Sequence, residues 1–129
     1  MSSFTDKLVV SKLKGKWWKV EREFEYYLDG GEIVTIPNGF ETDFASVPRI
    51  FWFILPPDGN YTQAAVLHDF LYQRNVFTRK KCDEVFLDAM TILEVPKWKR
   101  KVMYRALRMF GWTCWRKYEK PMEEDKESV

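Results

Sequence analysis

The sequence predicts a single α+β domain, in which an N-terminal antiparallel β-hairpin or small sheet is followed by a three-helix C-terminal part. The first third alternates between apolar and polar residues, and the second half shows helical spacing with capping residues at its breaks. The 129 residues, 46% of them hydrophobic, suffice for one core but are few for two. We expect the domain to cover residues 1–118 and the acidic segment 119–129 to be a flexible tail.

The expected strands lie in the first third of the chain. Residues 17–26 alternate with the period of two that is typical of a half-buried strand. Residues 29–32 contain two glycines and are typical of a turn, so residues 33–36 are expected to return as the second strand of a hairpin. Residues 40–44 are expected to add one more short strand.

Three helices are expected in the second half, joined by links so short that successive helices must be antiparallel neighbours. Thr78 is a good N-cap, Pro96 is a good first-turn residue, and Gly111 is a suitable C-cap. The expected helices cover residues 62–74, 78–93 and 96–110, and a short aromatic helix is expected before them, between Pro48 and Pro56.

Composition excludes several classes of protein. The longest apolar run, residues 50–55, is far shorter than the roughly 20 residues that span a bilayer, so we expect no transmembrane segment. No signal-peptide pattern opens the sequence, which indicates a protein of a reducing cytoplasm. Cys82 and Cys114 show no paired CxxC spacing and are expected to be free thiols, with neither a disulfide nor a zinc site.

A basic segment at residues 97–117 carries eight Lys or Arg residues and no acid, with tryptophans interleaved. It is either a helix with one core face and one solvated basic face, or a surface that binds phosphates, anionic lipid headgroups or an acidic protein. No known nucleic-acid-binding motif accompanies it, so specific nucleic-acid binding is not expected. The candidate binding residues are Lys99, Arg100 and Arg105.

His68, the only histidine, lies in a stretch that is otherwise almost wholly apolar. On a helix it shares a face with Tyr72, and Asp83 lies on the inward stripe of the next helix. An unpaired buried charge costs several kcal/mol, so Asp83 is expected to pair with His68, with the Tyr72 hydroxyl as a third member.

This cluster has two interpretations. In the first, Asp83 orients the imidazole and His68 is a general base that activates water or a substrate hydroxyl. In the second, the pair locks two helices together and meets no substrate. The adjacent Asp69 favours the first interpretation, because packing alone gives no reason for a second carboxylate.

A second group of candidates follows the last expected strand. Asp43 and Asp69 together are candidate ligands for a hard cation such as Ca²⁺ or Mg²⁺. Ser46 is a candidate nucleophile or ligand, although no GxSxG-type elbow surrounds it. Arg49 and Arg74 are candidates for binding a phosphorylated ligand. The alternative is that Asp43 or Ser46 merely caps the helix that is expected from Pro48.

The motifs at residues 42–49 (TDFASVPR), 55–57 (LPP) and 65–72 (AVLHDFLY) resemble a family of small bacteriophage and prophage proteins, which is catalogued as a domain of unknown function. The match covers roughly residues 17–112. The resemblance implies a phage protein that acts on or inside a bacterium, located in the host cytoplasm or in the phage particle.

A more local resemblance concerns the segment HDFLY at residues 68–72, which is similar to the active-site helix of the secreted phospholipase A₂ group. The glycine-rich calcium loop and the disulfides of that group are not evident here, and Asp43 is the candidate to supply the missing ligand. The resemblance implies His68 as base, Asp69 as metal ligand, Asp83 as the residue that orients the base, and Tyr72 as support for Asp83.

Two functions follow as hypotheses. The first is a metal-assisted hydrolase of an ester or another cell-envelope substrate, with a divalent cation stabilising the oxyanion. The second is a non-catalytic phage factor, in which the His-Asp cluster is structural. Such a factor would bind a host protein or a small phosphorylated signal, or would act in anti-defence or particle assembly.

Overall fold

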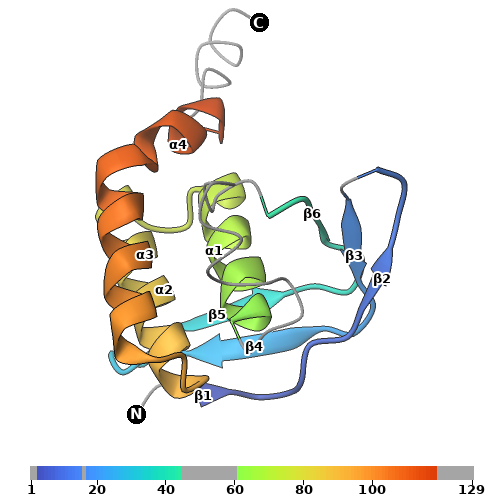
Figure 1. The fold of residues 1–129 in the computed structure, drawn as a ribbon. Coiled ribbons are helices and arrows are strands. Elements are labelled where there is room, and N and C mark those ends of the chain that lie inside the picture. The colour runs from blue at the N-terminus through green and yellow to red at the C-terminus, as the bar shows by residue number, and fades with distance from the viewer. Residues whose placement is uncertain (1–2, 16, 45–60, 119–129) are drawn as a thin grey trace, which may run out of the picture.

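The computed structural model describes residues 3–15, 17–44 and 61–118, and confirms the predicted α+β class (Figure 1). The strands form two small antiparallel sheets, and four helices follow them. Each sheet has three strands, and its middle strand pairs with both of the others. One sheet has the order β1 (Ser3–Phe4), β4 (Phe24–Tyr27), β5 (Ile33–Ile36), and the other has β2 (Val10–Lys12), β3 (Trp18–Val20), β6 (Glu41–Thr42).

The predicted hairpin is present as β4 and β5, but the single strand expected over residues 17–26 is wrong. The chain instead forms β3 and β4, which lie in different sheets. At the end of β3 the backbone of Val20 still pairs with Phe40, which precedes β6, whereas Phe24 at the start of β4 pairs with Ile36 of β5, so the pairing partner changes between Val20 and Phe24. Val20, Phe24 and Tyr26 are all buried, so the alternation of side chains continues across the break. Because the alternation of buried side chains continues, the sequence pattern did not reveal the break between β3 and β4.

The helices begin and end close to where the sequence predicts. α1 (Thr62–Arg74) has the expected bounds. α2 (Arg79–Ile92) is capped by Thr78, whose side-chain oxygen accepts a hydrogen bond from the backbone N–H of Lys81. α3 (Lys97–Phe110) follows Pro96 directly. The short helix expected from Pro48 and the expected flexible tail at 119–129 lie outside the described residues. Within the described residues, no helix is both long and apolar enough to cross a membrane.

Gly111 ends α3 as expected, but it does not terminate the helical path. Its backbone is right-handed, with φ −63°, and the sequence analysis did not foresee α4 (Trp112–Tyr118), which follows at once. A Cβ at this position would lie 2.5 Å from the Leu107 carbonyl oxygen and 2.8 Å from the Tyr72 hydroxyl. Glycine is therefore required here by a close approach to α1 rather than by a left-handed turn.

α1 is the centre of the molecule. It packs between the strands and the other helices, as Figure 1 shows. Every residue from 63 to 72 is buried, so the helix is covered on all sides. A helix covered on all sides needs no polar stripe, which is why the few polar groups that it carries must find partners inside the protein.

We predict that Gly111→Ala destabilises the fold. The new methyl group would overlap a backbone oxygen that cannot move away, and overpacking of this kind costs about 2 kcal/mol. The gain in helix propensity from Gly to Ala, at most about 1 kcal/mol, does not offset that cost. Urea denaturation of both proteins measures the difference.

Gly30→Ala is the matched control. The Cβ added there would meet only the flexible Glu32 carboxylate at 3.2 Å, so a change below about 0.5 kcal/mol is expected. Equal effects of the two substitutions would show that the close approach at Gly111 does not matter to stability.

Candidate functional site

The structure brings His68, Tyr72 and Asp83 together. His68 and Tyr72 lie one turn apart on α1, and Asp83 lies on the neighbouring α2. One carboxylate oxygen of Asp83, Oδ1, is 2.8 Å from His68 Nε2 and accepts a hydrogen bond of 2.6 Å from the Tyr72 hydroxyl. All three side chains are completely buried. The three residues therefore form one polar cluster inside an apolar core.

Two arginines complete the cluster from its other side. Arg108 on α3 donates to Asp83 Oδ2 at 2.7 Å, and Arg79, one turn before Asp83 on α2, lies 3.7 Å from the same oxygen. The Arg79 guanidinium also donates to the carbonyls of Leu107 and Arg108, near the end of α3. Asp83 thus connects α1, α2 and α3 through one carboxylate.

The electrostatics of the cluster favour an ionised Asp83. Burial by itself would raise the pKa of this carboxyl, but the hydrogen bonds from His68, Tyr72 and Arg108 outweigh it, and the pKa is lowered. Burial, followed by the negative charge of Asp83, raises the pKa of Tyr72 well above its ordinary value. At neutral pH Asp83 is an acceptor and the Tyr72 hydroxyl is a donor.

Aromatic rings hold the imidazole in place. The His68 ring lies 4.2 Å from the Tyr72 ring and 4.8 Å from the Phe86 ring, measured between centroids. Trp115 of α4 contacts the other side of Tyr72 edge-on, at 5.0 Å. Because an ionised carboxylate can only accept, Nε2 is the ring nitrogen that donates to Asp83. The carboxylate and the two rings therefore fix the orientation of the imidazole.

Asp69 belongs to a separate cluster, although it follows His68 directly in sequence. Its Oδ2 accepts hydrogen bonds from the Thr42 hydroxyl at 2.7 Å and from Gln73 at 2.8 Å, which ties α1 to β6. Thr42 in turn accepts from the backbone N–H of Phe44, whose φ of 60° is left-handed. Asp43, between them, is buried. Among the described residues, no three His, Cys, Asp or Glu side chains gather as metal ligands would.

The remaining candidates are not part of either cluster in the described residues. Ser46 and Arg49 lie outside those residues. Arg74 is exposed at the end of α1, with its guanidinium over the rings of Phe40 and Phe70. Lys99, Arg100 and Arg105 lie on α3.

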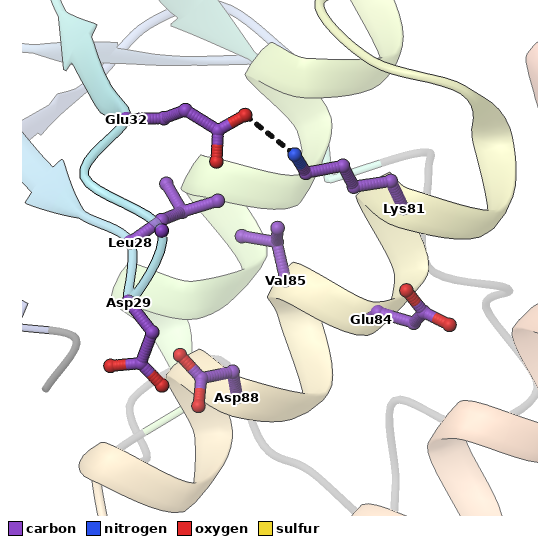
Figure 2. A pocket seen from close by; sticks show the side chains of 8 residues that line it. Leu28, Asp29, Glu32, Lys81, Glu84, Val85 and Asp88 are labelled. Atoms are coloured by element: carbon purple, nitrogen blue, oxygen red, sulfur yellow. Dashed lines mark hydrogen bonds and ion pairs between the residues drawn. The ribbon is translucent and has the colours of Figure 1, made fainter.

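A cleft of about 410 Å³ lies between the β4–β5 turn and α2 (Figure 2). Its rim carries four carboxylates, and Lys81 is held by Glu32 at 2.6 Å. Asp88 accepts a hydrogen bond from the Tyr26 hydroxyl. None of the residues that line this cleft belongs to the His68 cluster (His68, Tyr72, Asp83, Arg79 and Arg108), so the cleft and the cluster are separate sites. Its lining residues are Leu28, Asp29, Gly30, Glu32, Lys81, Glu84, Val85 and Asp88.

Sequence reasoning missed the two arginines and Thr42 as partners of the buried carboxylates. Arg79 had a signal, since it precedes Asp83 by four residues and so lies on the same helix face. Arg108 had no local signal in the sequence, because only the packing of α3 on α2 brings it to Asp83. Thr42 stands in a motif that the sequence analysis quoted, but its partner Asp69 is 27 residues away.

Comparison with known proteins shows the family. Residues 18–107 match the family described as a protein of unknown function, DUF1353. No solved structure matches the chain. Two similar proteins come from Sinorhizobium fredii (strain NBRC 101917 / NGR234). "Uncharacterized protein y4jT" is 32% identical over 100 residues, which make up 74% of this chain and 30% of that protein. "Uncharacterized protein y4iH" is 37% identical over 73 residues, 55% of this chain and 30% of that protein.

This chain spans less than a third of the length of either relative, so the relatives contain much that has no counterpart here. The family match begins at Trp18 in β3 and runs to Leu107 in α3. It includes His68, Tyr72, Asp83 and Arg79 of the cluster, and also Thr42 and Asp69, whereas Arg108 lies one residue beyond it. Because the match covers well over half of the sequence, the chain belongs to the DUF1353 family.

Proposed function

We propose that the chain is a bacteriophage accessory protein in which His68 acts as the general base of a hydrolytic site for an ester or another cell-envelope substrate. The observation that carries the proposal is the 2.8 Å contact between His68 Nε2 and an ionised, fully hydrogen-bonded Asp83. A base needs a fixed tautomer and a fixed direction, and this contact supplies both. The phage setting is supported by the motifs at 42–49, 55–57 and 65–72.

In the proposed reaction, His68 accepts a proton from water as the water oxygen attacks the ester carbonyl. Asp83 stays ionised and balances the positive charge that the imidazole gains, as an orienting carboxylate does in other His-Asp pairs. Tyr72 and Arg108 hold the carboxylate so that it cannot rotate away. The proton then passes to the leaving alcohol, which restores the neutral imidazole.

We predict that His68→Gln removes hydrolytic activity while the fold remains intact. Glutamine can still donate to Asp83, but it cannot accept a proton, and loss of a general base lowers the rate by about 10² to 10⁴-fold. The measurement is release of nitrophenolate from short-chain p-nitrophenyl esters, with thermal melting of each protein as the check on folding.

Glu84→Gln is the matched control, because this exposed carboxylate follows Asp83 on α2 and takes no part in the cluster. It should hydrolyse the esters at the wild-type rate. The proposal is wrong if the wild-type protein cleaves none of these esters, or if His68→Gln cleaves them as fast as the wild type does.

A divalent cation, Ca²⁺ or Mg²⁺, is a separate part of the proposal, with Asp69 and Asp43 as its ligands. The support is that both carboxylates are buried next to the end of β6, and that hard cations prefer oxygen ligands. We predict that Ca²⁺ at 100 times its Kd stabilises the wild-type protein by about 2.7 kcal/mol relative to EDTA, and stabilises Asp69→Asn much less. Thermal melting with and without the ion measures this.

In that experiment each protein is compared with itself, because Asp69→Asn also disturbs the hydrogen bonds to Thr42 and Gln73. Absence of a shift in the wild-type protein would remove the cation from the proposal. It would leave the general-base role of His68 untouched.

A second candidate function, a non-catalytic phage factor, is favoured by a specific observation. His68 and Asp83 are completely buried, and two arginines already contact the Asp83 carboxylate. Asp83 therefore does not depend on a protonated His68 for a charge partner. A buried group of this kind is sufficient as an anchor between helices, and function would then reside on the surface of the molecule.

In this second role Asp83 contributes to the free energy of unfolding, and the direction in which that contribution changes with pH can be stated. The folded-state pKa of Asp83 is lowered, so its stabilisation is fully present above the unfolded value near 4 and is lost as the pH falls through the folded value. We predict that Asp83→Asn costs about 3 kcal/mol at neutral pH. The free energy of unfolding of Asp83→Asn should also fall less than that of the wild type as the pH is lowered from about 5 to about 2.

Urea denaturation at a series of pH values measures both effects, with Glu84→Gln as the control that should follow the wild-type curve. Parallel curves for Asp83→Asn and the wild type would contradict the assignment of Asp83 as an ionised anchor.

A further inference from the structure

The outer face of α3 carries large apolar side chains that no other element covers in the described residues. Trp98 is 58% exposed and Met109 is 64% exposed. With Arg105 they follow spacings of seven and four residues, so all three lie on one face of the helix. Trp112, 48% exposed, begins α4 just beyond. The rise of about 1.5 Å per residue separates Trp98 from Met109 by roughly 16 Å along α3.

Positive charge surrounds these apolar groups. Between residues 97 and 117 the sequence has eight basic residues and no acidic one. The Lys99 ammonium lies 5.6 Å from the centre of the Trp98 ring, and the Arg116 guanidinium lies 5.9 Å from that of Trp112. Each exposed tryptophan therefore has a cation next to it, and no carboxylate of α3 or of the described part of α4 opposes an anionic partner.

A cleft of about 290 Å³ adjoins this face where α3 meets α2. It is lined by Lys97, Arg100 and Lys101 from α3, and by Leu87 and Thr91 from α2. Three cations around a small hollow with an apolar residue in its wall suit a phosphate that is attached to a hydrocarbon chain. The cleft does not include any residue of the His68 cluster.

We propose that this face, formed by Trp98, Arg105, Met109 and Trp112 with the adjoining basic cleft, docks on an anionic lipid bilayer. Tryptophan and methionine enter the boundary between headgroups and acyl chains, while lysine and arginine remain at the level of the phosphates. An acidic protein or a nucleic acid would match the charge. A nucleic acid would not explain why Met109, which offers no ring for a base to stack on, is the most exposed of the large apolar residues named for this face, and binding to an acidic protein is an outcome that the test separates. The inference does not rest on the proposed function, because it concerns another surface.

The test is co-sedimentation of the full chain with vesicles of two compositions, phosphatidylglycerol mixed with phosphatidylcholine and phosphatidylcholine alone. We expect binding to the anionic vesicles, weakening at high salt, and little binding to the neutral ones. Trp98→Ala should lower the partition coefficient by about tenfold, because it removes a large side chain from the interface. The double variant Lys97→Gln/Lys101→Gln should lower it by about tenfold or more, since each cation contributes near a charged surface.

Matched controls lie at the opposite edge of the molecule, around β2 and β3 (Figure 1). Trp17→Ala removes a tryptophan that is 38% exposed, and Lys12→Gln/Lys14→Gln removes two exposed lysines in β2 and just after it. Both should bind the anionic vesicles as the wild type does. All the substituted residues are exposed, and melting temperatures near that of the wild type are expected.

Three outcomes would overturn the inference. The first is equal binding to both kinds of vesicle, or to neither. The second is an equal loss of binding in Trp98→Ala and Trp17→Ala, which would show that this face is not the one in contact. The third is retention of the chain by duplex DNA or by an acidic polypeptide without any binding to vesicles.

Discussion

The buried carboxylate of Asp83 is the interaction on which the arrangement of the helices depends. A charged group in an apolar core is tolerated only if its partners repay the loss of water, and here the partners come from three helices. His68 and Tyr72 place α1 against α2, and Arg108 places α3 against both. Gly111 completes the arrangement, because only a residue without a side chain lets the end of α3 come so close to Tyr72. The contacts that hold the helices together are therefore the same contacts that would support the proposed chemistry of His68.

The sequence alone predicted the α+β class, the hairpin and three of the helices, and it predicted them for local reasons. Thr78 and Pro96 mark helix starts by their own chemistry, and the glycines at 30 and 31 mark a turn. What it missed is non-local. Between β3 and β4 the chain stops pairing with β6 and starts pairing with β5, while Val20, Phe24 and Tyr26 are all buried on either side of the break. α4 was missed because Gly111 is typical of a helix end, whereas here it serves a close contact.

The same distinction applies to the candidate site. The meeting of His68, Tyr72 and Asp83 follows from helical spacing and from the need of a buried charge for a partner. The reasoning about Asp69 was weaker, because it assumed that packing has no use for a second carboxylate. The hydrogen bonds from Thr42 and Gln73 supply that use by joining α1 to β6. Adjacent residues on a fully buried helix point toward different neighbours. His68 therefore contacts α2, whereas Asp69 contacts β6. The hydrolytic proposal thus depends on His68 and Asp83 and not on the adjacency of His68 to Asp69.

The anchor at Asp83 also decides which surface α3 presents. Among the basic residues of 97–116, whose side chains the structure describes, Arg108 contacts the buried carboxylate, and Met103, Ala106 and Leu107 face the core beside it. Once these positions face inward, the helical repeat forces Trp98, Arg105 and Met109 outward. A basic, tryptophan-rich segment with no obvious division in the sequence is therefore divided by the structure into one partly buried ion pair and one exposed amphipathic face. Any substitution at Asp83 that lets α3 rotate would alter both, whereas substitutions on the exposed face leave the anchor as it is. Substitutions on the exposed face, such as Trp98→Ala, therefore test the docking proposal without disturbing the contacts of Asp83.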